Sequence, residues 1–283
     1  MSISRFVPAV WAANLLVALQ KSHVFAQAGV VNRDYEGEIA QVGDTVHITS
    51  ISDPTIGTYT ANSTTITPEE LTDARRTLTI DQAKYFAFQV DDIDRRQARG
   101  DVINQAMSRA AYKLRDVVDA YIAGLYTQAQ AANALGTISV TAGTPTDAYD
   151  KILVPLKVKL DEANVPIEGR WVVVPPWLHG RLLLDGRFIK ANESADPSTL
   201  RNAQIGRAAG FDIMTSNNSV NVVGDDYSVM AGTDMAISFA EQIASVEAYR
   251  PQSSFSDAVK GLHLWAARVI RPEGIATAVA SQT

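Results

Sequence analysis

One long amphipathic segment, residues 101–132, constrains the fold of this chain more than any other feature. Its apolar side chains recur at steps of three and four, which places them on one face of a helix. They are Val102, Ala106, Ala110, Leu114, Val117, Tyr121 and Leu125. Arg115 and Asp119 are four residues apart and are expected to pair on another face. At the usual helical rise the segment spans roughly 45 Å, which is long for an ordinary small domain.

Two alternating segments on either side of a polar stretch predict a long β-hairpin. Val46 and Ile48 alternate with polar residues in the first segment, and Leu78 and Ile80 do so in the second. The residues between the segments, 51–68, are rich in Ser, Thr, Gly and Pro and nearly uncharged. A hairpin connection usually needs only about two to five residues, so we expect an extended, projecting loop. A loop of this length is usually functional or disordered.

The N-terminal segment, residues 1–28, allows two interpretations. Arg5 precedes an apolar run, and Ala26 and Ala28 follow it in a small-x-small pattern, as in a secretory signal peptide. Against secretion, Lys21 and His23 separate the run from that pattern, and the run is shorter than a membrane span of about 20 residues. We favour a partner-binding arm, because helical spacing places one set of apolar side chains on a common face that must be buried. The set is Val7, Val10, Trp11, Leu15, Ala18 and Leu19.

The second half of the chain alternates helical and strand-like segments. Residues 146–164 are predicted to form a helix with a break at Pro155. Residues 170–176 are typical of a buried strand, and residues 176–184 of a short helix. Residues 185–210 are polar and loop-like. Four later segments are typical of strands separated by Gly, Asn and Pro: FDIMTSNN, YSVMAGTDMAISFA, ASVEAYRP and GLHLWAARVIRP.

Composition and charge argue against several classes of function. The formal net charge is −6, and no basic stripe offers the counterion release on which nucleic-acid binding depends. The absence of cysteine excludes disulfides, thiolate metal sites and cysteine nucleophiles. The chain is 46% hydrophobic, which is enough for one large core or two modest ones.

The motifs predict no catalytic, cofactor-binding or metal site. The chain lacks both the phosphate-binding P-loop and the nucleophile elbow of serine hydrolases. Asp91, Asp92 and Asp94 suit the start of a helix better than a calcium loop, because no distal glutamate follows them at the required spacing. The four histidines lie far apart in sequence, without a paired ligand spacing: His23, His47, His179 and His263.

Taken in order, these features resemble the Hong Kong ninety-seven fold of tailed-bacteriophage major capsid proteins. Four segments carry the likeness: VFAQAGVVNRDYEGEIAQVGDTVHI, RWVVVPPWLHGRL, IGRAAGFDIMTSNN and VKGLHLWAARVIRPEG. No single motif is specific to the family. The resemblance rests on the order and spacing of the four segments over nearly the whole chain. The resemblance implies the α+β fold of a phage major capsid protein, in the coat-protein subfamily without a large inserted domain.

The resemblance also implies how the chain is divided. We expect an N-terminal arm at 1–28, an extension-loop hairpin with flanking strands at 29–90, and a spine helix with part of the peripheral domain at 91–139. An axial domain at 140–240 would follow, and return strands of the peripheral domain at 241–283. Candidate self-assembly contacts are expected on the arm and the loop: Val7, Trp11, Leu15, Leu19, Pro54, Ile56, Tyr59 and Ile66.

The implied function is that of a structural, non-enzymatic protein. Copies of the chain would assemble as hexamers and pentamers into an icosahedral head in the host bacterial cytoplasm. The head would enclose double-stranded DNA without sequence-specific binding, and the protein would be part of the virion. The resemblance implies a separate scaffolding protein and a portal as partners, a decoration protein as a further possible one, and neither cofactor nor membrane. Two alternatives remain: an encapsulin-like compartment with an enzyme as cargo, and a soluble α/β enzyme.

Some relatives of this fold join neighbouring subunits covalently, through a lysine on the extension loop and an asparagine of a neighbour. This sequence has no lysine between Lys21 and Lys84, so its projecting loop lacks the required amine. With cysteine also absent, we expect the assembled subunits to be held by non-covalent contacts alone.

Overall fold

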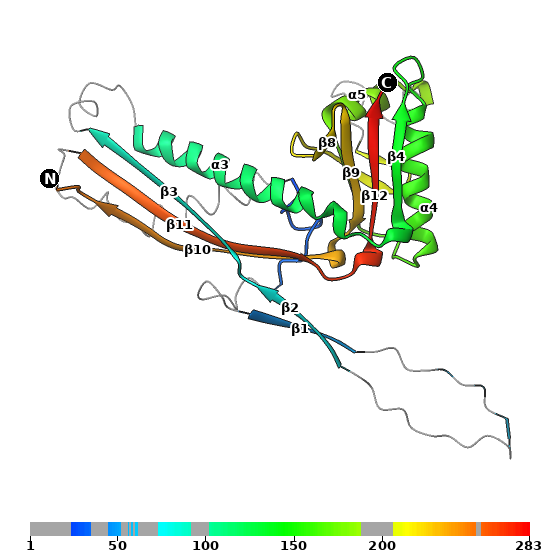
Figure 1. The fold of residues 1–283 in the computed structure, drawn as a ribbon, viewed down its shortest axis with the longest axis horizontal. Coiled ribbons are helices and arrows are strands. Elements are labelled where there is room, and N and C mark those ends of the chain that lie inside the picture. The colour runs from blue at the N-terminus through cyan, green and yellow to red at the C-terminus, as the bar shows by residue number, and fades with distance from the viewer. Residues whose placement is uncertain are drawn as a thin grey trace.

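The structure is a computed structural model of the chain. It describes residues 24–34, 45–51, 56, 58, 60–61, 73–91, 102–187, 206–252 and 256–283. Helices and strands form a long part and a compact part, with one hairpin projecting from them (Figure 1). The predicted α+β class is confirmed.

The long part consists of helix α3 (Val102–Gly124) lying along an antiparallel sheet of three strands. The sheet has the order β10 (Ile237–Tyr249), β11 (Ser256–Val269) and β3 (Gln82–Asp91). Apolar side chains fill the space between helix and sheet: Met107, Ala111, Leu114, Phe86, Phe88, Val90, Val246 and Val259. A Cβ at position 261 on β11 would overlap the ring of Phe86, so only glycine lets that ring lie across the strand.

Helix α3 differs from its prediction in its length and in the side chains it buries. It ends at Gly124 and tightens into 3-10 turns at Leu125–Gln128 and Ala131–Asn133. At the usual rise its 23 residues span about 35 Å. The buried face of α3 differs in part from the predicted apolar stripe, because Val117 of that stripe is 43% exposed. The buried apolar residues are Met107, Ala111, Leu114, Val118, Ile122 and Ala123.

The compact part is a mixed seven-stranded sheet. Its order is β4 (Ala134–Val140), β12 (Ile275–Gln282), β9 (Asp226–Thr233), β5 (Arg170–Val174), β7 (Phe211–Thr215) and β6 (Arg207–Ala208), with β8 (Asn221–Val223) paired to β9. A π-helical turn (Ala148–Leu153), α4 (Val154–Glu162) and α5 (Pro176–Leu184) pack on it. The π-helical turn passes into α4 beside Pro155, where the break was predicted.

Strand β5 shows why its sequence is apolar without alternation. All of its five residues are buried. Val172 and Val174 belong to the core under α4 and α5, whereas Trp171 and Val173 belong to a second core on the other face. That second core also contains Trp265 of β11, so it joins the seven-stranded sheet to the three-stranded sheet.

Two strands of the seven-stranded sheet depart from the predictions. β4 and β12 were not predicted, because β12 is rich in alanine and its strand conformation depends on burial between β4 and β9. The segment YSVMAGTDMAISFA was predicted as one strand but forms two. A 3-10 turn at Asp234–Ala236 separates β9 in one sheet from β10 in the other.

The projecting hairpin consists of β1 (Thr45–Ile51) and β2 (Asp73–Thr79), paired antiparallel from Thr45 opposite Thr79 to Ile51 opposite Asp73. It leaves the body of the subunit near β11 (Figure 1). Its base is anchored because Leu78 and Ile80 are buried against Ala240, Leu264, Ala266 and Ile270. The two strands predicted on either side of a long loop are therefore confirmed.

Candidate functional site

The hairpin β1–β2 is the first candidate for a contact between subunits. Its two strands form a sheet of their own, and a two-stranded hairpin is marginally stable at best in water. The Arg268 guanidinium donates to the carbonyl oxygen of Thr77 at 2.6 Å and fixes the base of β2 to β11. Farther out, Ile56 is 95% exposed. An isoleucine this exposed, five residues after the end of β1, is suited to burial against another molecule.

The segment 24–34 is bound within its own subunit. The carboxylate of Asp119 on α3 accepts hydrogen bonds from the backbone amides of Val24 at 2.8 Å and Ala26 at 3.2 Å. The amide of Asn32 donates to the carbonyl oxygen of Ile237 at 2.8 Å. Four of the segment's side chains are almost completely buried in the core that joins the two sheets: Phe25, Ala26, Val30 and Val31.

This packing changes two expectations from the sequence. Residues 24–28, which were assigned to the arm, contribute to the subunit's core through Phe25 and Ala26. The predicted pair of Arg115 with Asp119 was wrong, because Asp119 turns inward to the 24–34 segment and Arg115 lies over the ring of Tyr112 at 4.4 Å. The Asp119 carboxylate lies there because the backbone amides of Val24 and Ala26 would otherwise have no hydrogen-bond acceptor.

A buried ionic cluster ties the same segment to the three-stranded sheet. Arg33 forms an ion pair with Glu241 on β10, and its guanidinium lies 5.2 Å from the centre of the Phe239 ring. The other carboxylate oxygen of Glu241 is 3.2 Å from Nε2 of His263 on β11. The side chains of Glu241 and His263 are both 1% exposed. Since a buried carboxylate needs partners, losing one of them is costly.

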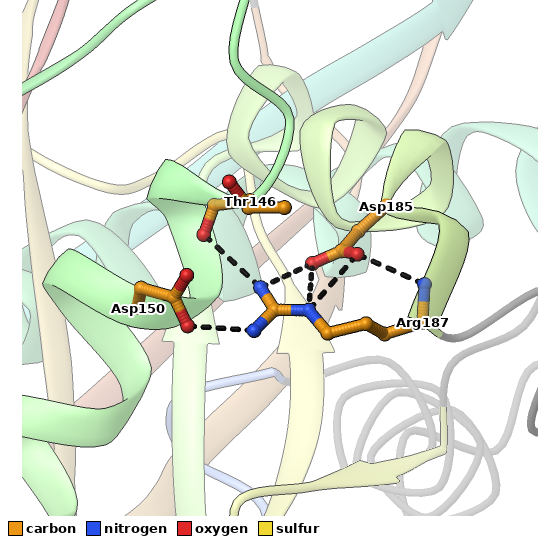
Figure 2. Close-up of polar contacts among 4 residues, drawn as sticks. All are labelled: Thr146, Asp150, Asp185 and Arg187. Carbon is orange, nitrogen blue, oxygen red and sulfur yellow. Dashed lines mark hydrogen bonds and ion pairs between the residues drawn. The ribbon is translucent and has the colours of Figure 1, made fainter.

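A polar clamp fixes the end of α5 (Figure 2). The Arg187 guanidinium lies between two carboxylates, with Nη2 2.7 Å from Asp185 and Nη1 2.7 Å from Asp150. It also lies over the ring of Tyr149 at 4.8 Å. The hydrogen bond from Arg187 lowers the pKa of the Asp185 carboxyl, and burial opposes this only in part. The clamp therefore holds the residues after α5 to the π-helical turn.

The family comparison identifies what these surfaces belong to. The family model described as "Phage capsid protein" matches residues 73–278. The chain belongs to the phage capsid protein family. It is a tailed-phage major capsid protein with the Hong Kong ninety-seven fold, as the resemblance implied, and its role is structural. Family and structural neighbours point away from an enzyme and place the protein in the virion.

Solved structures agree with this membership. The chain is 35% identical to one from Mycobacterium phage Che8, with a TM-score of 0.72 over 92% of this chain and 91% of that chain. The capsid of cyanophage P-SCSP1u is 15% identical, with a TM-score of 0.71 over 93% of this chain and 90% of that chain. A virus-like particle from Pyrococcus furiosus has 12% identity and a TM-score of 0.55, over 96% of this chain and 98% of that chain, and shows the common fold alone. A search of curated proteins found no match.

Of the eight predicted assembly contacts in the capsid protein, the structure describes Ile56 and finds it exposed. The other seven lie outside the described residues: Val7, Trp11, Leu15, Leu19, Pro54, Tyr59 and Ile66. Several exposed apolar residues were not predicted, and two of them are adjacent in the sequence. Val222 and Val223, beside the β8–β9 turn, are 40% and 71% exposed. Two adjacent valines before Gly224 and Asp225 were the available signal.

Ligand chemistry is sparse in the part of the capsid protein that the structure describes. No three His, Asp or Glu side chains of that part gather into a group that could hold a metal ion. Burial lowers the pKa of His179, and His263 is engaged with Glu241. Within the same residues, no helix has the length and apolar character that crossing a membrane requires.

Proposed function

We propose that this capsid protein assembles as hexamers and pentamers into an icosahedral head enclosing double-stranded DNA. The observation that carries the proposal is the hairpin β1–β2, which among the described strands forms a sheet of its own, with Ile56 95% exposed beyond β1. A strand pair that is not part of a larger sheet gains stability when a neighbouring subunit buries it. Copies arranged around an axis give each hairpin such a neighbour.

We propose further that the arm consists of residues 1–23. Burial of Phe25 and Ala26 supports an end of the arm at Val24, where Asp119 binds the backbone. The apolar face of the arm would then cross to another subunit from a fixed starting point. Its contact residues are Val7, Trp11, Leu15 and Leu19, and those of the loop are Pro54, Ile56, Tyr59 and Ile66.

The same proposal assigns α3 as the spine helix, the three-stranded sheet as the peripheral domain and the seven-stranded sheet as the axial domain. This moves β4 and β12 out of the ranges 91–139 and 241–283, where the sequence placed the peripheral domain. The net charge of −6 suits a container whose wall does not bind the enclosed DNA tightly. A separate scaffolding protein, a portal and a decoration protein are proposed partners on the strength of the family resemblance. Assembly would take place in the host bacterial cytoplasm.

Electron microscopy of the purified full chain tests the proposal. We expect closed shells or rings from the wild type, and a folded subunit without regular shells when residues 52–66 are deleted. A second variant replaces residues 52–66 by Gly and Ser at constant length. It distinguishes the contribution of the loop's side chains from the contribution of the loop's length. Circular dichroism reports whether each variant folds. Normal shells from the deletion would show that the loop is not an assembly contact, and a compact monomer with enzymatic turnover would favour the enzyme alternative.

A further inference from the structure

One face of α3 is exposed along most of the helix. Five residues recur along α3 at steps of three or four, which places them on a single line of the helix surface. They are Arg109, Lys113, Val117, Ala120 and Gly124. All five are exposed, whereas the opposite face is buried against the three-stranded sheet. The line covers about 23 Å of the helix. We call it the α3 strip.

The N-terminal half of the α3 strip is basic and aromatic. Tyr112 borders it and is 54% exposed. The Lys113 ammonium lies 5.9 Å from the centre of the Tyr112 ring, and the Arg115 guanidinium lies 4.4 Å from it. Arg109, Lys113 and Arg115 form no ion pair with any residue that the structure describes. Most cations around α4 and α5 differ, since they have a carboxylate partner: Lys151, Lys157, Lys159, Arg170 and Arg187. Arg181 on α5 instead donates to the carbonyl oxygen of Ala142.

The positions of these cations do not help the helix itself. Arg109 and Lys113 are like charges four residues apart, a spacing that destabilises a helix. Neither lies in the last turn, where the helix dipole favours cations. The repulsion between these two exposed cations is explained when a negatively charged partner compensates it.

The C-terminal half of the α3 strip is apolar and small. Val117 is 43% exposed, and Ala120 and Gly124 continue the line. A Cβ placed on Gly124 would meet no atom within 4 Å, so the backbone of another element has room to approach. Asp116 is the acidic residue beside the line, which leaves two net positive charges among Arg109, Lys113, Arg115 and Asp116.

We propose that the α3 strip is a docking site for an acidic amphipathic helix of a different protein chain. Carboxylates of that helix would face Arg109, Lys113 and Arg115, and its apolar side chains would pack on Val117 and Ala120. Duplex DNA matches the cations but leaves the apolar half without a function, and the whole chain is acidic. A second copy of α3 brings the same excess of positive charge and leaves the cations unmatched. The inference goes beyond shell formation and does not depend on it.

Fluorescence anisotropy with the full chain tests this docking. The probe is a labelled helical peptide of about 16 residues, matched to the length of the strip, with leucines on one face and flanking glutamates. The double charge reversal Arg109→Glu and Lys113→Glu is expected to weaken binding about tenfold or more, equivalent to about 1.4 kcal/mol. Added salt should weaken it too. Arg271→Glu is a single-reversal control, because Arg271 is an exposed cation that is not part of the strip.

Two further variants separate docking from simple charge attraction. Ala120→Tyr leaves the charge unchanged but fills the small half of the strip, and it should also weaken binding. A peptide in which lysines replace the glutamates should not bind. All substituted side chains are exposed, and circular dichroism checks that each variant folds.

Three results would overturn the proposal. The first is equal binding by the wild type and the double reversal. The second is preferential binding of a duplex DNA probe over the peptide, with the same dependence on Arg109 and Lys113. The third is sedimentation showing that the strip residues drive association between copies of the chain while the peptide does not bind. None of these depends on whether shells form, so this proposal and the shell proposal can fail separately.

Discussion

The seven-stranded sheet and the hairpin β1–β2 differ in what stabilises their strands. In the sheet, β5 is buried at every position, with side chains in one core on each face. The hairpin forms only its own ladder, and Ile56 beyond β1 is 95% exposed. One region is stabilised within the subunit, and by our proposal the other is stabilised by neighbouring subunits. Substitutions in the first should therefore change unfolding, and substitutions in the second should change assembly.

The largest contrast is expected between Leu160→Ala and Ile56→Ala. Leu160 on α4 is fully buried, so its truncation should lower the free energy of unfolding by about 2–5 kcal/mol. Ile56→Ala should leave unfolding unchanged and reduce the yield of shells. Urea titration followed by circular dichroism measures the first effect, and electron microscopy the second. Equal destabilisation by both variants would remove the distinction between the regions.

A second comparison sets substitutions in the arm, before Val24 in the sequence, against a substitution just after Val24. Trp11→Ala combined with Leu15→Ala should weaken assembly more than it lowers the melting temperature of the subunit. Phe25→Ala should do the reverse, because Phe25 is 2% exposed within its own subunit. Truncating a buried aromatic residue typically costs about 3–5 kcal/mol. If the double variant melts as early as Phe25→Ala does, the arm belongs to the subunit's own core.

A smaller effect is expected from Asp119→Ala. The substitution leaves the amides of Val24 and Ala26 without their acceptor, at a cost of about 1–3 kcal/mol for a buried donor. Hydrogen exchange at these two amides should accelerate, and the melting temperature should fall. Asp116→Ala is the control, since Asp116 lies three residues away on α3 and is only partly buried. Unchanged exchange at Val24 would show that Asp119 does not fix the segment.

The clamp at α5 should make a small, pH-dependent contribution. Because Arg187 lowers the pKa of Asp185 in the folded state, the folded chain binds fewer protons than the unfolded chain. The stabilisation is therefore present above the ordinary carboxyl pKa of about 3.9 and is lost as pH falls through the lowered folded value.

Arg187→Gln should accordingly lower the melting temperature at neutral pH, by an amount equivalent to about 1 kcal/mol or less, because Arg187 is half exposed. The difference from the wild type should shrink below about pH 4. Lys260→Gln, which removes the exposed pair with Glu247, should change little at either pH. A difference that grows on acidification would contradict the assignment to Asp185.

No covalent connection is expected between hairpins of neighbouring subunits. Boiling purified particles in denaturing detergent should release one band near 30.6 kDa. A ladder that resists heat and reductant would contradict this and direct attention to Lys84, which is exposed on β3. Lys84→Arg would then be the first substitution to make, because it keeps the charge and removes the amine.

The hairpin and the long helix could be predicted because their periodicities are local. The sequence could not show the acceptor for Val24, because Asp119 is 95 residues away. It could not pair Glu241 with His263 either, since that contact depends on the register of β10 against β11. Basic residues form no stripe when the sequence is considered over the whole chain. Arg109 and Lys113 become neighbours only because they lie on one face of α3. The exposure of Val117 shows that a helical period locates an apolar face only approximately.

The core around Phe25 has a consequence for shell curvature. A closed shell of identical subunits places them at slightly different inclinations, which requires some adjustment within or between subunits. Here the two sheets are joined by turns at Asp234–Ala236 and Pro272–Gly274, and Phe25 is packed in the core that they share with Trp171 and Trp265. Packed interiors resist gradual deformation. Changing the angle between the sheets would require repacking Phe25, so curvature is more easily adjusted where subunits meet than where their sheets join.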